Sequence, residues 1–208
     1  MATMHYLLFG ILSVAVFLLG GVGNRTLRDK VAVSQVETRS DIPCVAWQAR
    51  QPTQTPMVAP GQSAGLRERM VDIAVREIGV SEATGHNDGR RVEEYLACTG
   101  LGKGYAWCAA FVSWTYAKAG LSAPRNAWSP ALFPLARRYT KKEIQQNSFR
   151  QADLFAIHNA SLGRINHVGI VRKVAGNWIW TVEGNSANRV SSRRRALATI
   201  HAFANWLD

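Results

Sequence analysis

Three residues of this chain, Cys108, His167 and Glu183, have the types suited to nucleophilic catalysis. Cys108 begins a segment with apolar residues at helical spacing, which ends at Gly120. A cysteine in the first turn of a helix lies at the positive end of the helix dipole, which favours the nucleophilic thiolate. The competing interpretation is a buried structural cysteine, because a free thiol also behaves as a small apolar group.

A cysteine nucleophile needs a general base and a third polar group that orients the imidazole of that base. His167 lies in the alternating segment 165–174, and Glu183 lies in the next such segment, 178–185. Because the turn at Gly176 separates them, the two segments are predicted to form a hairpin. The hairpin would bring His167 and Glu183 together on one face, within reach of the N-terminus of a helix packed on the sheet.

The elements that must position these residues are helices before and at Cys108, and strands after it. Residues 121–150 contain three prolines and two aromatic residues that look exposed, Trp128 and Phe133, so they are predicted to form a functional loop bordering a cleft. Helices followed by an antiparallel sheet indicate the α+β class. Helices are predicted from the N-cap Ser63 to Gly79, from Arg91 to Cys98 and from Cys108 to Gly120, and strands at 153–158, 165–174, 178–185 and within 196–203.

The N-terminal segment 1–23 is predicted to be a signal peptide or a membrane anchor. Residues 6–23 are apolar and uncharged, which suits either role. The basic residues that follow the run favour a cytoplasmic domain by the positive-inside rule, whereas its apolar core favours export to the periplasm or the cell exterior. We expect export. Residues 24–63, rich in proline and polar residues, are predicted to be a linker, and 64–208 a single catalytic domain.

The formal charge of +11 indicates an anionic partner, such as a phosphate-bearing wall or a membrane surface. The basic residues form short clusters rather than one stripe with interleaved aromatics, which argues against specific nucleic-acid binding. The three cysteines contain no CxxC pair and the histidines no HExxH spacing, so no metal site is predicted. A Cys44–Cys98 disulfide would leave Cys108 free, whereas a Cys98–Cys108 bridge would remove the nucleophile.

Three motifs in this order resemble one known family. Trp107-Cys108-Ala109-Ala110-Phe111-Val112, Asn166-His167-Val168-Gly169-Ile170 and Glu183-Gly184-Asn185 are similar to the CHAP amidohydrolases, papain-like cysteine peptidases related to the NlpC-type wall peptidases. The resemblance covers about residues 64–204. One departure is Ala152 in Ala152-Asp153, where family members usually have Gly-Asp, and it affects the backbone of a turn.

The resemblance implies a papain-like fold and the hydrolysis of an amide or peptide bond in peptidoglycan through a thioester, with no cofactor. Cys108 would attack the carbonyl, His167 would act as base and then acid, and Glu183 would orient it, with Asn185 as helper or substitute. The backbone N–H of Cys108 and a second donor, for which Tyr105 is the candidate, would hold the oxyanion.

Several alternatives stay open on the sequence alone. His158 is a rival base, and Trp107 and Trp128 are candidates for contact with substrate, although a tryptophan is more often part of the core. A different function would be a catalytically silent module that binds the wall or assembles at the membrane. A third would be an amidase on the cytosolic side.

Overall fold

A computed structural model describes residues 60–208, all of which belong to one compact unit. The predicted N-terminal apolar segment, nearly all of the linker and Cys44 lie outside the described residues. No helix in this described part has the length and hydropathy of a membrane span.

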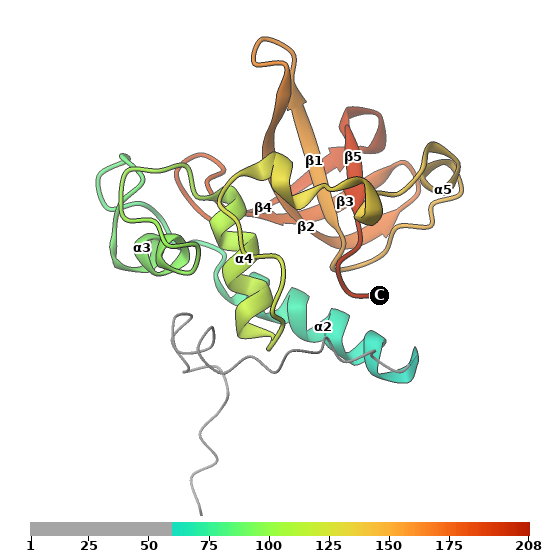
Figure 1. Ribbon diagram of the computed structural model, residues 1–208, viewed down its shortest axis with the longest axis horizontal. Helices are drawn as coiled ribbons and strands as arrows, with labels where there is room; N and C mark the ends of the chain where they lie inside the picture. Colours follow the sequence, from blue (N-terminus) through green and yellow to red (C-terminus); the bar gives the residue numbers. More distant parts are fainter. Residues whose placement is uncertain (1–59) are drawn as a thin grey trace, which may run out of the picture. The chain divides into compact units, whose positions relative to one another are not determined.

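Helices come first along the described chain and strands follow, so the α+β prediction is confirmed (Figure 1). The helices are α2 (Pro60–Arg76), α3 (Arg90–Ala97), α4 (Cys108–Lys118) and α5 (Lys141–Gln145), with 3-10 turns η2 (Ser129–Leu132), η3 (Leu135–Arg137) and η4 (Leu197–Thr199). The strands are β1 (Leu154–Asn159), β2 (Arg164–Ala175), β3 (Trp178–Glu183), β4 (Ser191–Ala196) and β5 (Ala202–Ala204).

Helix α4 is the central helix, and every residue from Cys108 to Ala117 is buried. Gly120 has φ of 89°, and the N–H of Leu121 donates to the carbonyl of Tyr116 at 3.0 Å. A left-handed residue with this bond is a common way to end a helix, and glycine adopts that conformation without strain. The predicted end of the helix at Gly120 is therefore confirmed. Helix α2, by contrast, begins at Pro60, ahead of the predicted cap Ser63.

The five strands form one antiparallel sheet in the order β4-β3-β2-β1-β5. Strands β2 and β3 form the predicted hairpin, with Val171 opposite Thr181 and Ile170 opposite Val182. Strand alternation then puts His167, Gly169 and Val171 of β2 on the same face as Thr181 and Glu183 of β3.

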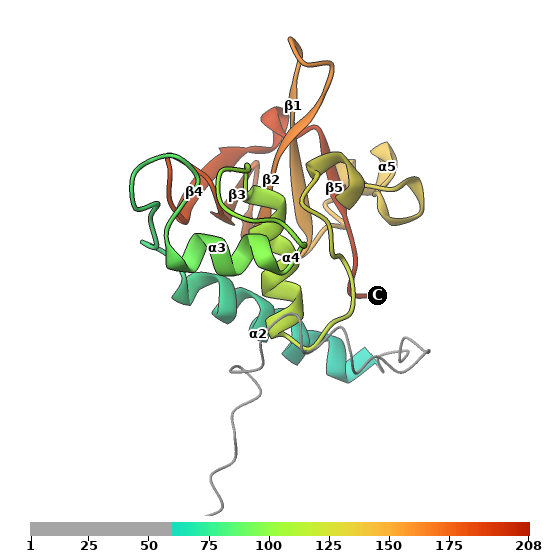
Figure 2. The ribbon, with the colours of Figure 1, turned by 60° about the vertical axis from the view of Figure 1, so that its left-hand side comes forward.

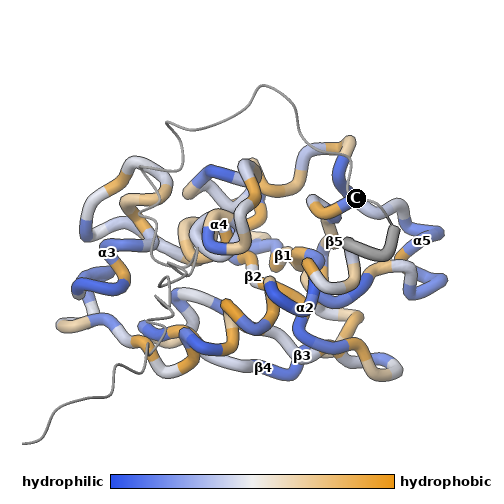
Figure 3. The backbone as a smooth tube through the Cα atoms, turned by 90° about the horizontal axis from the view of Figure 1, so that it is seen from below, coloured by the Kyte–Doolittle hydropathy of each residue, from blue (hydrophilic) through white to orange (hydrophobic). Residues whose placement is uncertain are grey.

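Apolar side chains cover both faces of this sheet. Helices α2 and α4 pack on the face that carries Val168, Ile170 and Val182, and α3 packs against α4, as Figures 1 and 2 show. On the other face, Phe155 and Val171 belong to a second cluster that includes stacked phenylalanine rings, and Ile144 of α5 packs against it. Figure 3 shows hydrophobic segments along the inner strands β1 and β2, and hydrophilic ones on α5.

Several predictions about the second half of the chain were wrong. Strand β4 was not predicted, because it is an edge strand with three consecutive arginines and shows little of the apolar alternation that marks inner strands. The predicted strand within 196–203 overlaps only the end of β4 and most of β5, with the turn η4 between them. Phe133 is 1 % exposed and belongs to the core, whereas Trp128 is 58 % exposed as predicted.

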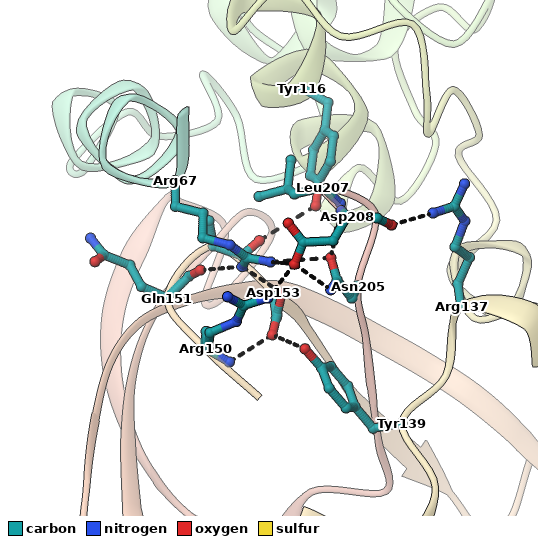
Figure 4. A network of polar contacts seen from close by, with 11 residues as sticks. Arg67, Tyr116, Arg137, Tyr139, Arg150, Gln151, Asp153, Asn205, Leu207 and Asp208 are labelled. Carbon is teal, nitrogen blue, oxygen red and sulfur yellow. Dashed lines mark hydrogen bonds and ion pairs between the residues drawn. The ribbon is translucent and has the colours of Figure 1, made fainter. Parts of the chain in front are cut away.

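A buried charge network connects α2 to the sheet (Figure 4), and we call Arg67, Tyr139, Asp153 and Asp208 the anchor network. The Nη1 atom of Arg67 donates to Oδ1 of Asp153 at 2.7 Å, and its Nη2 donates to Oδ2 of Asp208 at 2.8 Å. The hydroxyl of Tyr139 donates to Oδ2 of Asp153 at 2.7 Å. Ala152, just before Asp153, has φ of 68° and is fully buried, so the departure from Gly-Asp does fall on a left-handed residue.

Candidate active site

Cys108 is the first residue of α4 and the one free cysteine among the described residues. Its side chain lies in the first helical turn, where backbone N–H groups without helical partners favour a negative charge. The preceding residue, Trp107, helps to fix the position of Cys108. Trp107 is fully buried and donates from Nε1 to Oε1 of Glu82 at 2.8 Å. Cys108 is therefore held by core packing on both sides.

His167 and Glu183 lie side by side on the β2–β3 hairpin, and Nε2 of His167 is 2.8 Å from Oε2 of Glu183. Gly169 makes this approach possible. A Cβ at that position would lie 2.9 Å from Cγ of Glu183 and 2.7 Å from the ring of Phe155. The histidine therefore needs glycine two residues later, because any side chain there would displace the carboxylate that orients the imidazole.

Glu183 is fully buried and accepts four hydrogen bonds. Its Oε2 accepts from His167 and from Nη2 of Arg195 at 2.6 Å. Its Oε1 accepts from Nε of Arg195 at 2.6 Å and from Oγ1 of Thr181 at 2.5 Å. Such a carboxylate is fixed in orientation and in charge.

The thiol of Cys108 lies near the imidazole of His167. The imidazole of His167 and the backbone N–H of Val168 act on the thiol and lower its pKa, and Oγ of Ser129 lies 3.3 Å from Sγ. Since Nε2 of His167 contacts Glu183, Nδ1 is the ring nitrogen left to exchange a proton with Sγ. We call Cys108, His167, Glu183 and Arg195 the site network.

These contacts shift the pKa values of Cys108, His167 and Glu183. Burial raises the pKa of the Cys108 thiol, but the hydrogen bond and charge of His167 outweigh burial and leave that pKa below its ordinary value. Burial lowers the pKa of His167, but hydrogen bonds to Cys108 and Glu183 raise it to about 9. Burial also opposes the charge on Glu183, yet bonds from Arg195 and His167 lower its pKa to about 2. The charge of His167 therefore favours the thiolate form of Cys108, and the carboxylate of Glu183 favours the imidazolium form of His167.

A pocket opens over the thiol and the imidazole. Polar side chains dominate its wall, and it reaches from the start of α4 to β4. It is lined by Ala106, Cys108, Asn166, His167, Asn185, Ser186 and Arg195. Cys108 and His167 are therefore both part of its wall.

The comparison with protein families agrees with this arrangement. Residues 100–185 match the family model described as the CHAP domain, a range that contains Cys108, His167 and Glu183. The resemblance seen in the sequence motifs is therefore confirmed.

Solved structures similar to this chain are NlpC/P60 proteins, and no curated protein matches it. The peptidoglycan hydrolase RipB from Mycobacterium tuberculosis has 14 % identity and a TM-score of 0.47, covering 80 % of this chain and 79 % of that one. RipD from M. tuberculosis, described as non-catalytic, has 13 % identity and a TM-score of 0.44, covering 68 % and 98 %. The P60 domain of the M. avium paratuberculosis antigen MAP1272c has 14 % identity and a TM-score of 0.44, covering 70 % and 96 %.

The other predicted site residues differ in their exposure and in their contacts. Asn185 lines the pocket, has φ of 53° and donates from Nδ2 to Oδ1 of Asn87 at 3.1 Å, so Glu183 and not Asn185 is the carboxylate or amide that contacts His167. Tyr105 and Trp128 are both 58 % exposed, next to the residues that flank the nucleophile. Trp107 is fully buried, so it supports the site from the core and does not face the pocket.

His158, the rival base, lies elsewhere. It is exposed on β1, and its ring stacks on that of His201 with centroids 4.8 Å apart. Cys98 is disulfide-bonded and Cys108 is free, which rules out the Cys98–Cys108 bridge. Among residues 60–208, no group of three His, Cys, Asp or Glu side chains is placed to hold a metal ion.

Two residues of the site were missed by sequence reasoning. Arg195 belongs to a run of three arginines that suggested solvated surface, and only the pairing of β4 with β3 brings it to Glu183. Ser129 lies in the proline-containing loop, and only the folded path of that loop brings its hydroxyl to Sγ. Neither residue has a local sequence signal that could have identified it.

Proposed function

We propose that this chain is a cysteine amidohydrolase that cleaves an amide or peptide bond of peptidoglycan through a thioester on Cys108. The observation that carries the proposal is that Cys108, at the start of α4, shares a pocket with His167, whose Nε2 lies 2.8 Å from Oε2 of Glu183. The CHAP domain match supports the reaction class, and the charge of +11 fits a protein that works on an anionic wall. Export by the N-terminal apolar segment stays a prediction.

The reaction would begin with attack of the Cys108 thiolate on the carbonyl carbon. The C–S bond forms and the carbonyl electron pair moves to oxygen, where the backbone N–H of Cys108 and a second donor would hold the oxyanion. Tyr105 is the candidate donor. Its side chain is largely exposed, so its hydroxyl is open to a ligand.

His167 would then supply the proton that the leaving amine needs. Collapse of the oxyanion breaks the C–N bond, and the imidazolium protonates the departing nitrogen. Neutral His167 next takes a proton from water, which attacks the thioester and releases the acid and the thiolate. Glu183 keeps the imidazole in one orientation throughout, because its four hydrogen bonds fix the carboxylate.

The test is a digest of purified sacculi with the full chain, followed by mass spectrometry of the released fragments. Wild-type protein should release fragments whose masses identify the bond, and Cys108→Ala and His167→Ala should release none. His158→Ala is the matched control and should release the wild-type fragments. Cleavage by Cys108→Ala at the wild-type rate would contradict the proposal. Absence of fragments with folded wild-type protein would favour the silent wall-binding module.

A further inference from the structure

Arg195 makes a two-point contact with the carboxylate that orients the base. Its Nε and Nη2 atoms donate to the two different oxygens of Glu183, both at 2.6 Å. The guanidinium also lies over the ring of Phe155, 5.6 Å from its centroid, and its side chain is 27 % exposed. The planar fork of arginine matches both carboxylate oxygens, which fixes the plane of the carboxylate as well as its charge.

The neighbouring arginines of β4 do different things. The guanidinium of Arg194 lies over the ring of Trp178, 4.4 Å from its centroid. Arg193 donates from Nε to Oγ of Ser186 at 3.1 Å. Of the three consecutive arginines, Arg195 is the one that hydrogen-bonds Glu183, so its role is specific to its position in the strand.

We propose that Arg195 is a positioning residue that keeps Glu183 ionised and aimed at Nε2 of His167, so that edge strand β4 becomes part of the catalytic machinery. Its effect on hydrolysis rests on the proposed function. Its effect on the thiol does not, because the thiol can be examined without a substrate.

Charge balance in a buried site gives Arg195 this role. When the thiol is ionised, the charges of the thiolate, imidazolium, carboxylate and guanidinium of the site network sum to zero. The ionisable groups that hydrogen-bond Glu183 among the described residues are His167 from β2 and Arg195 from β4. Without Arg195 the set has one excess negative charge in a buried environment, which favours protonation of Glu183 or of Cys108. In either case the thiolate would form at higher pH.

The experiment measures the rate of Cys108 alkylation by iodoacetamide against pH in the full chain, with the modified cysteine identified by mass spectrometry. In Arg195→Gln the midpoint of the rate should rise by about one pH unit, because Glu183 without its charged partner supports the imidazolium, and hence the thiolate, less well. Arg195→Lys should recover most of the shift. Arg194→Gln removes the same charge from the neighbouring position and should leave the midpoint unchanged.

Kinetics on peptidoglycan separate positioning from substrate contact. Arg195→Gln should lower kcat about 10- to 100-fold, as for residues that orient a catalytic group, with KM within about twofold of wild type. In a Glu183→Gln background the same substitution should cause little further loss, because Arg195 acts through Glu183. A rise in KM alone, or losses that multiply in the double variant, would overturn the proposal.

Thermal unfolding identifies a merely structural role. A folded Arg195→Gln protein with lowered stability and an unchanged alkylation midpoint would overturn the proposal, and so would an equal shift in Arg194→Gln. A shifted midpoint in Arg195→Gln together with a wild-type chain that cleaves no peptidoglycan would contradict the proposed function alone and would support the role of Arg195.

Discussion

The anchor network and the site network both pair a buried carboxylate with an arginine, but they leave different groups at their ends. In the anchor network, Asp153 is held by Arg67 and by the hydroxyl of Tyr139, and burial still raises the pKa of Asp153. In the site network, the two-point contact of Arg195 together with His167 lowers the pKa of Glu183 to about 2 against the effect of burial.

The difference lies in what the carboxylate is connected to. Asp153 is bound to an arginine that keeps its proton at any working pH, so the anchor network has no reactive end. Glu183 contacts an imidazole, and the imidazole acts on a thiol, which in the proposed function loses its proton and attacks a carbonyl. Under the proposed function, a buried ion pair is therefore structural in the anchor network and takes part in catalysis in the site network, because the site network has an additional titratable group, the thiol.

The largest expected effect comes from removing the charge at the centre of the site network. Glu183→Gln should lower kcat/KM about 10³- to 10⁴-fold, because an amide no longer stabilises the imidazolium or fixes its tautomer. The measurement is fragment release from sacculi, with circular dichroism as the check on folding. Glu68→Gln, an exposed carboxylate on α2, is the control and should keep full activity. Equal activity of Glu183→Gln and Glu68→Gln would contradict the proposal that the site network takes part in catalysis.

Breaking the anchor network should change stability and leave the thiol unchanged. Arg67→Gln should lower the free energy of unfolding by about 3–5 kcal/mol, because it leaves the fully buried Asp153 carboxylate without its charged partner. Urea unfolding measures this loss. Arg69→Gln, exposed on the same helix, should cost less than about 0.5 kcal/mol. A changed alkylation midpoint of Cys108 in folded Arg67→Gln would show that the networks are coupled.

The pH profile should sharpen the contrast further. Activity should fall as the pH rises through about 9, the pKa of His167, because neutral imidazole cannot protonate the leaving amine. On the acid side, activity should persist below the ordinary thiol value of ~8.5, since the pKa of Cys108 is lowered. The measurement is kcat/KM across pH. Loss of activity below ~8.5 would indicate a thiol without an imidazolium partner.

The smallest expected effect is a gain in stability beside the anchor network. Ala152→Gly should raise the free energy of unfolding by about 0.5–1 kcal/mol, because alanine at φ of 68° is strained and glycine is not. Activity should stay at the wild-type level. Ala156→Gly, in the middle of β1, should instead lower stability by about 1 kcal/mol. A loss of stability in Ala152→Gly would mean that the methyl group packs better than the backbone strain costs.

The sequence predicted the elements with strong local patterns and the residues placed by them. Helix α4 and the β2–β3 hairpin have clear periodicity and glycine turns, so Cys108, His167 and Glu183 could be related from the sequence alone. Strand β4 has no apolar alternation, because its edge position lets charged side chains point outward. The arginine that contacts Glu183 therefore depends on strand pairing, which the local sequence does not encode.

The role of the long loop also depended on tertiary structure. Trp128 was predicted to be exposed and is, whereas Phe133 is buried in the core. A single aromatic residue in a loop has no neighbours at regular spacing that would reveal its direction. The contact between Ser129 and Cys108 likewise arises only when the loop folds over the start of α4.

The most direct test of the central claim is the rate of Cys108 alkylation against pH in the wild-type full chain. The claim is that the site network keeps the Cys108 thiol ionised at neutral pH, and it needs no assumption about the substrate. We predict a midpoint well below the ~8.5 of a free thiol, with rapid modification at neutral pH. A midpoint at or above that value would mean that burial outweighs the imidazolium, and Cys108 would then be a structural cysteine.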